Sequence, residues 1–148
     1  MKKKMHNIEV AFVSTEKELQ KIFGLRKEVF VKEQGVPNEI EVDKFDYEAK
    51  HLIAKSSGNV IGTCRLLTED KVGKIGRMAV KSDFRGKGVG SLILDKLVEF
   101  SKSQNLEELL LHAQIHAVKF YKKSGFEICS DKIIEEAGIK HLKMNMRL

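Results

Sequence analysis

Three glycines at alternate positions, Gly86, Gly88 and Gly90, separate an apolar strand pattern from an amphipathic helix pattern. Glycine has no Cβ atom, so this segment lets a large anion approach the backbone closely. The start of the following helix offers unpaired N–H groups and a positive dipole end, and Arg85 and Lys87 add mobile positive charge. The segment therefore predicts a phosphate-binding loop. A tight turn with close packing of the helix on a sheet is the structural alternative.

The spacing of this loop differs from two common phosphate-binding loops. A P-loop needs four residues between its first glycine and a Gly-Lys-Ser/Thr ending, which the sequence lacks. A dinucleotide-binding loop needs a third glycine at the position of Ser91. Glu107 lies where such a loop would have its ribose-binding acid, but the strands before the loop are predicted to be antiparallel, not a parallel βαβ unit. Another phosphate-bearing ligand is therefore favoured.

Periodicity and turn residues along the 148 residues predict one domain of α/β class, in which helices flank a mixed α+β sheet. The predicted order is β-α-(α)-β-β-β-α-β-α-β-β. The predicted strands are 8–13, 51–55, 60–68, 73–80, 108–113, 126–134 and 141–147. The predicted helices are 15–32, a short one within 39–48, one from 86 or 88 to 104, and 116–124. Turns at 56–59 and 70–71 predict three consecutive antiparallel strands.

Charge and composition restrict the partners. Lys and Arg outnumber Asp and Glu by 27 to 21, which favours an anionic partner. Apart from Lys2 to Lys4 the positive charges are scattered, so we expect no nucleic acid. Neither Cys64 nor Cys129 has a second Cys or His at ligand spacing, so we expect no metal and reduced thiols. Without an apolar run after Lys4 or a membrane-spanning stretch, a cytoplasmic protein without membrane contact is expected.

The loop resembles the cofactor loop of the GNAT superfamily of N-acetyltransferases, which has the form Arg/Gln-x-x-Gly-x-Gly/Ala after the fourth strand. Segment 117–126, which contains Phe120-Tyr121 and Gly125-Phe126, resembles that family's Phe-Tyr-x-x-x-Gly-Phe segment. The two matches cover about residues 72–128, and the predicted strand order extends the likeness to the whole chain. Segments 26–34 and 137–144 resemble a small bacterial single-domain subgroup that has no agreed substrate. Some of its members are labelled as acting on glucosamine phosphate.

The resemblance implies an acetyl-CoA-dependent N-acetyltransferase that transfers an acetyl group to a primary amine of a small molecule by direct attack in a ternary complex. Relatives often pair through their C-terminal strands, so the resemblance is compatible with a homodimer. The acetyl-CoA-binding residues that it implies are Met78, Ala79, Val80, Arg85, Gly86, Lys87, Gly88, Val89, Gly90, Ser91, Gln114, Tyr121 and Lys123.

Acyl transfer from a thioester to an amine needs a polarised carbonyl, an acid for the leaving thiolate and a base for the amine. The resemblance implies a backbone N–H near Met78 as the oxyanion donor and Tyr121 as the acid. Simple packing of Tyr121 is the structural alternative. Many relatives carry a Glu base on the fourth strand, but here that strand has no carboxylate near Met78. Glu33, His51, His112 or an ordered water remain candidates for the base.

The acceptor pocket is expected to include Arg26, Phe30, Gln34, Arg65, Arg77 and His112. Because Arg77 would make this pocket more cationic, an acidic or phosphorylated acceptor is favoured. An ion-pair network of Arg26, Arg65, Asp43 and Asp46 that pins the first helix to the sheet is the structural alternative. A coenzyme A-binding module without catalysis is the functional alternative.

A second resemblance is to the acyl-homoserine lactone synthases, which share the GNAT fold. It rests on Arg26-x-x-Val29-Phe30, on the acidic segment 41–46 and on Arg65-Leu66. In those enzymes such residues position S-adenosylmethionine. The short chain, the absence of tryptophan and the intact coenzyme A loop count against this interpretation.

Overall fold

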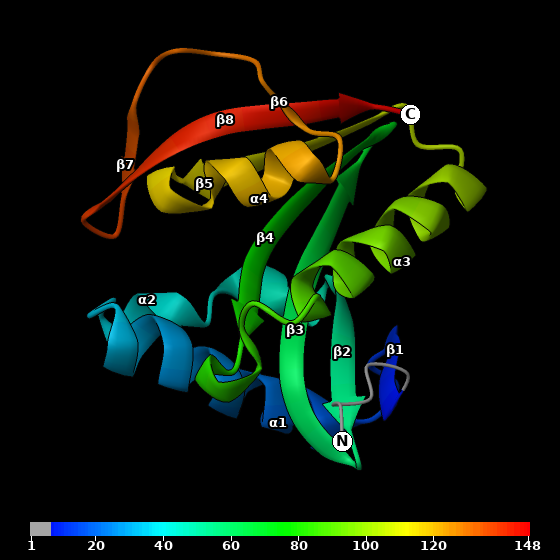
Figure 1. The fold of residues 1–148 in the computed structure, drawn as a ribbon, viewed down its shortest axis with the longest axis vertical. Coiled ribbons are helices and arrows are strands. Elements are labelled where there is room, and N and C mark those ends of the chain that lie inside the picture. Colours follow the sequence, from blue (N-terminus) through cyan, green and yellow to red (C-terminus); the bar gives the residue numbers. More distant parts are fainter. Residues whose placement is uncertain (1–6) are drawn as a thin grey trace.

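The computed structural model describes residues 7–148, so the Lys2 to Lys4 cluster lies outside the described residues. One mixed sheet has the strand order β1-β2-β3-β4-β5-β8-β6, and β7 pairs with β8 (Figure 1). The strands are β1 (Ile8–Phe12), β2 (Lys50–Ser56), β3 (Asn59–Glu69), β4 (Val72–Val80), β5 (Glu108–Gln114), β6 (Glu127–Ile128), β7 (Ile134–Glu136) and β8 (Ile139–Arg147). The predicted α/β class with a mixed sheet is confirmed.

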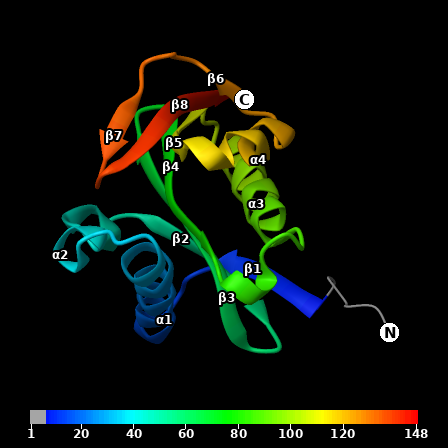
Figure 2. The same cartoon turned by 60° about the vertical axis from the view of Figure 1, so that its left-hand side comes forward.

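Helices cover both faces of this sheet, with α1 and α2 on one side and α3 and α4 on the other (Figure 2). The α-helices are α1 (Glu16–Arg26), α2 (Asn38–Glu41), α3 (Val89–Ser103) and α4 (Val118–Lys123). Shorter helical turns are the π-helical η2 (Lys27–Glu33) and the 3-10 turns η3 (Lys44–Tyr47), η4 (Ser82–Phe84) and η5 (Ile115–Ala117). Within the described chain, none of the helices combines the length and the apolar character needed to cross a membrane.

The main core lies between the sheet and the α3–α4 layer. Val89 and Ile93 of α3 are completely or almost completely buried against β3. A Cβ atom at Gly62 of β3 would lie 2.9 Å from Ile93 Cδ1, so this glycine allows the helix to approach the strand closely. Burial of apolar side chains in this layer is the main stabilising contribution of the fold.

Two predicted elements differ from the structure. The first helix begins as predicted after Thr15, whose Oγ1 accepts a hydrogen bond from Glu18 N, but its α-helical part ends at Arg26 and continues as η2. A 3.6-residue pattern does not mark a π-helical turn, which shifts the register of the helix faces. The predicted strand 126–134 is instead split into β6 and β7, because the mostly exposed segment between them leaves the sheet.

A buried ion-pair network connects α1 to the acidic segment and the sheet. Arg26 is completely buried, with Nε donating to Glu41 Oε2 at 2.8 Å and Nη1 donating to Asp46 Oδ1 at 2.8 Å. Arg65 Nη1 on β3 donates to Asp43 Oδ1 at 2.8 Å and to Asp46 Oδ1 at 3.1 Å. Burial alone would raise the pKa of Asp46, but the hydrogen bond and charge of Arg26 lower it to about 2. The four residues of the predicted network therefore do form one.

His51 of β2 lies beside this network as a buried imidazole. Its Nε2 lies 2.8 Å from the carbonyl oxygen of Asp46, so Nε2 donates, and its Nδ1 has no hydrogen-bond partner within residues 7–148. Burial lowers the pKa of His51 below its ordinary value of 6.5, and the charges of Arg26 and Arg65 act in the same direction. The folded protein therefore holds His51 neutral at a pH where the unfolded chain protonates it.

We expect this histidine to make the protein less stable in mild acid. The unfolded chain takes up a proton near pH 6.5 but the folded protein does so only at lower pH, so the free energy of unfolding should fall as pH drops below 6.5. His51→Gln keeps the donor to Asp46 and should reduce this fall, measured by urea unfolding at pH 7, 6 and 5. The control His116→Gln, at an exposed position, should keep the wild-type pH dependence. An unchanged slope in His51→Gln would contradict this assignment.

Candidate active site

A cleft opens where the parallel strands β4 and β5 separate. Their pairing runs along 72–75 and 108–111 and then stops. In the pairing of β4 with β3, Arg77 and Met78 together oppose the single residue Cys64, which makes a β-bulge. Arg77 has φ 53°, a left-handed conformation that is uncommon for a residue with a side chain. A bulge bends its strand and increases the local twist, so it accounts for the divergence of β4 from β5.

The diverging edge of β4 carries backbone groups that no neighbouring strand uses. The carbonyl oxygen of Val80 accepts a hydrogen bond from Arg85 Nε at 2.8 Å on this edge, whereas Lys81 N donates to Ile61 O on the opposite side. Because successive residues of a strand direct their N–H groups to alternate sides, Met78 and Val80 face the open edge and Ala79 faces β3. The edge can therefore pair with an extended ligand.

The cleft has a volume of about 1410 Å³ and reaches from this edge to the N-terminus of α3. Gly88 is the residue before α3 and has φ 85°, and Gly86 has φ 73°. A Cβ atom at Gly86 would meet nothing within 4 Å. Left-handed backbone and open space at a helix start fit an anionic group. The residues predicted for the cofactor that line the cleft are Met78, Ala79, Val80, Arg85, Gly86, Gly88, Val89, Gly90, Ser91, Gln114 and Tyr121.

Gly90 has a different role from the other two loop glycines. A Cβ atom at this position would lie 2.8 Å from Phe120 Cζ. The missing side chain of Gly90 therefore makes room for the ring of Phe120. Close packing was the structural alternative for the whole loop, and it applies to this glycine. Gly86 and Gly88 instead provide the left-handed backbone of the loop.

Five residues with predicted or candidate site roles do not line the cleft: Arg26, Glu33, His51, Lys87 and Lys123. Arg26 cannot contact an acceptor as predicted, because its guanidinium is completely buried by its carboxylate partners. Glu33 Oε1 accepts a hydrogen bond from Arg85 Nη2 at 2.7 Å, so the carboxylate predicted as a base is engaged with a cation. Lys87 Nζ lies 5.8 Å from the centre of the Phe84 ring. Lys123 is the exposed last residue of α4.

Tyr121 lies in the wall of the cleft beneath the α4 backbone. Its side chain is 8% exposed and packs against the rings of Phe120 and Phe126. Burial raises the pKa of Tyr121 above its ordinary value of 10, and nearby Cys64, whose own pKa is raised to about 12 by burial, adds to this effect. The phenol therefore stays protonated at neutral pH, which is the state that a proton donor needs.

The other predicted acceptor residues that line the cleft are Phe30, Gln34, Arg65, Arg77 and His112. Gln114 Nε2 at the end of β5 donates to Gln34 Oε1 at 2.9 Å, which links η2 to β5. Arg77 Nη2 lies 3.1 Å from Asp43 Oδ2, and its Nε lies 3.4 Å from Glu41 Oε2. The charge of Arg77 is therefore balanced by these carboxylates, contrary to the predicted cationic pocket.

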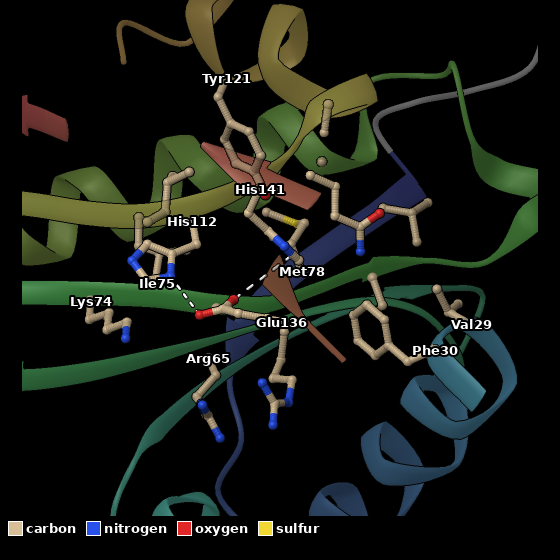
Figure 3. A pocket seen from close by; sticks show the side chains of 18 of the residues that line it. Val29, Phe30, Arg65, Lys74, Ile75, Met78, His112, Tyr121, Glu136 and His141 are labelled. Carbon is tan, nitrogen blue, oxygen red and sulfur yellow. Dashed lines mark hydrogen bonds and ion pairs between the residues drawn. The ribbon is translucent and has the colours of Figure 1, made fainter. Parts of the chain in front are cut away.

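Glu136 and His141 are among the polar residues of the cleft that were not predicted from the sequence. Glu136 of β7 lies with Oε2 2.7 Å from His112 Nδ1 and with Oε1 3.9 Å from His141 Nε2 (Figure 3). His112 and His141 come from the adjacent strands β5 and β8. No local spacing connects Glu136 with His112, and only the β5–β8 register and the β7–β8 hairpin bring the three side chains together. Residues 7–148 contain no group of three or more His, Cys, Asp or Glu side chains arranged to hold a metal ion.

Comparison with known proteins agrees with this architecture. The model of the Acetyltransferase (GNAT) domain matches residues 11–148. The uncharacterized N-acetyltransferase YjcF of Bacillus subtilis is 36% identical over 137 residues, which are 93% of this chain and 98% of that protein. The solved structure of an acyl-CoA N-acyltransferase from Pseudomonas aeruginosa is similar with a TM-score of 0.83 and 30% identity, over 94% of this chain and 99% of that chain.

A GNAT family acetyltransferase from Elizabethkingia anophelis, solved with acetyl-CoA bound, shares the fold with a TM-score of 0.76 and 19% identity, over 96% of this chain and 99% of that chain. The family model spans nearly the whole chain, and the relatives above 30% identity cover it almost completely. The chain belongs to the GNAT acetyltransferase family and is an acyltransferase.

Proposed function

We propose that this protein is an acetyl-CoA-dependent N-acetyltransferase that acetylates a primary amine of a small molecule by direct attack in a ternary complex. The observation that carries the proposal is the open edge of β4, which leads directly to left-handed glycines at the N-terminus of α3. The open edge of β4 can pair with an extended pantetheine arm, and the loop with the left-handed glycines can hold phosphates. A GNAT family acetyltransferase from Elizabethkingia anophelis that shares this fold was solved with acetyl-CoA bound, which supports acetyl-CoA as the acyl donor.

Acetyl-CoA supplies an activated acyl group as a thioester when bound. In our proposal the N–H of Met78 on the open edge donates to the acyl oxygen and stabilises the negative charge that develops there. The hydroxyl of Tyr121 gives its proton to the departing sulfur. The raised pKa of Tyr121 does not prevent this transfer, because the same dry surroundings also raise the proton affinity of a thiolate.

The charges around the acceptor side bear on the choice of amine. Within the cleft lining, Arg65 and Arg77 pair with carboxylates of the acidic segment. The charge argument for an acidic or phosphorylated acceptor, such as an amino sugar phosphate, is correspondingly weaker. Asp43, Arg26 and Arg65 are also engaged in the network, so a synthase-like site for S-adenosylmethionine has less support than a simple amine site.

The test is a screen of primary amines for release of free thiol from acetyl-CoA, with mass spectrometry to identify the N-acetylated product. Binding of acetyl-CoA is measured separately by calorimetry. Turnover of at least one amine, with a product heavier by one acetyl group, supports the proposal. Binding without turnover of any amine would instead support a non-catalytic coenzyme A-binding module. Failure to bind acetyl-CoA would overturn both functions.

Gly86→Ala should weaken acetyl-CoA binding, while its loss of folding stability should be no larger than that of a control glycine variant. The new methyl group occupies the open space of the loop, and we expect Kd to rise by about tenfold, or about 1.4 kcal/mol of binding free energy. Gly58→Ala is a matched control, because Gly58 has φ 83°, equally open surroundings and a place in the β2–β3 turn. Both variants should lose about 1–2 kcal/mol of stability from left-handed strain. A Kd unchanged in Gly86→Ala would place the phosphates elsewhere.

A further inference from the structure

The proposed reaction needs a base for the amine, and the structure separates the candidates. Glu33 lies outside the cleft lining and is bound to Arg85. His51 is buried against the ion-pair network and does not line the cleft. His112 does line it. Of these three side chains, only His112 can meet an acceptor in the cleft.

His112 lies at the apex of the cleft. The last pair between β4 and β5 joins Ile75 to Leu111, and His112 is the next residue of β5. Met78 follows Ile75 by three residues on β4. His112 and Met78 are therefore two residues apart along the diverging strands, with the bulge at Arg77 between them. An amine nitrogen and an acyl group can lie side by side in such an interval.

The hydrogen bonds of His112 leave one ring nitrogen available as a base. An ionised carboxylate only accepts hydrogen bonds, so the contact of 2.7 Å between His112 Nδ1 and Glu136 Oε2 places the proton on Nδ1. Nε2 then carries the free lone pair. This is the orientation that a carboxylate imposes on a histidine base in other acyl-transfer sites.

Other charged groups also face this imidazole. His141 of β8 donates from Nδ1 to Ile139 O at 2.7 Å and lies with Nε2 3.9 Å from Glu136 Oε1, so it adjoins the same carboxylate. Lys143 is the register partner of His112 on β8, and Lys74 of β4 lies on the same side of the sheet (Figure 3). Among these groups, Glu136 is the one that holds the ring of His112.

We infer that His112 is the general base of the acyl transfer and that Glu136 is its positioning residue, an inference that rests on the proposed function. His112 Nε2 accepts a proton from the amine nitrogen as the new nitrogen–carbon bond forms. The carbon–sulfur bond breaks, and the sulfur takes the proton of the Tyr121 hydroxyl. The proton on His112 is lost to solvent and Tyr121 regains one, so the sum is amine plus thioester to amide plus thiol.

The experiment compares His112→Gln, Glu136→Gln and the control His116→Gln, whose exposed histidine also lines the cleft. We expect kcat/KM to fall by about 100-fold in His112→Gln and by a smaller factor in Glu136→Gln, with acetyl-CoA Kd unchanged in both. Added imidazole should restore part of the activity of His112→Ala.

A second measurement does not depend on activity. Nitrogen NMR of the histidine-labelled, ligand-free protein should show the proton of His112 on Nδ1, and Glu136→Gln should weaken this preference. A proton found on Nε2 instead would overturn the inference, as would wild-type kcat/KM in His112→Gln or an equal loss in His116→Gln. If the wild-type protein acetylates no amine, the proposed function fails and the inference fails with it. If the wild-type protein acetylates an amine and His112→Gln has the same kcat/KM, the inference fails and the proposed function stands.

Discussion

Arg26→Met is expected to lower the free energy of unfolding by about 3–5 kcal/mol. Methionine fills a similar volume but leaves Glu41 and Asp46 as buried carboxylates without their main cationic partner. Asp46 is 1% exposed, so water cannot take the place of the guanidinium. A buried charge that loses its partner is far more costly than the intact pair is stabilising. Urea unfolding at pH 7 measures the loss.

Arg77→Met is the matched control for this prediction. Its side chain is 27% exposed, and it contacts Glu41 and Asp43 from the cleft side of the same network. Partly exposed ion pairs contribute less than completely buried ones, so we expect a loss of about 1 kcal/mol. The double variant Arg26→Met with Asp46→Asn should recover part of the stability. Equal losses for Arg26→Met and Arg77→Met would contradict the central position of Arg26.

Tyr121→Phe is expected to lower kcat/KM by about 100-fold or more, with little change in acetyl-CoA Kd. The substitution removes the proposed proton donor and keeps the ring that packs between Phe120 and Phe126. Among the described residues no hydrogen bond holds the hydroxyl in place, so the folded protein should lose little stability without it. Thiol release with an amine from the screen measures the effect, and calorimetry measures the Kd.

The other tyrosine of the chain, Tyr47, provides the control. It is 66% exposed, and Tyr47→Phe should leave kcat/KM unchanged. Because burial raises the pKa of Tyr121 above 10, the phenol should remain a donor across neutral and mildly alkaline pH, with no loss of wild-type activity from its ionisation there. Full activity in Tyr121→Phe would contradict the role as proton donor and would favour the structural alternative, in which Tyr121 only packs in the core.

Features that depend on local sequence were predictable. The three antiparallel strands before the loop follow from turn residues and strand periodicity, and the structure has them at β2, β3 and β4. The loop at the start of α3 follows from its glycines, and the family from its two short segments. Each of these signals lies within about ten residues of sequence, where turn chemistry and side-chain alternation act directly.

Features that depend on long-range pairing were not predictable. The bulge at Arg77 has no signature of its own, since its left-handed residue is an arginine and not a glycine. The positive charge of Arg77 is balanced by carboxylates that lie more than thirty residues away in the sequence. Glu136 meets His112 only after the β7–β8 hairpin folds against β5. The part of the cleft around Arg77 and His112 is assembled from such distant contacts, so its electrostatics cannot be predicted from local patterns.

The contact between Gly90 and Phe120 has a consequence for how this enzyme can change. Phe120 precedes Tyr121 in α4, so the ring that rests on the first turn of α3 belongs to the same helical turn as the proposed proton donor. Any substitution that shifts α3 away from α4 therefore changes the distance between the loop before α3 and the phenol of Tyr121. We therefore expect substitutions at Gly90 to change both the acetyl-CoA Kd and kcat. Substitutions at Gly86 should change the Kd alone.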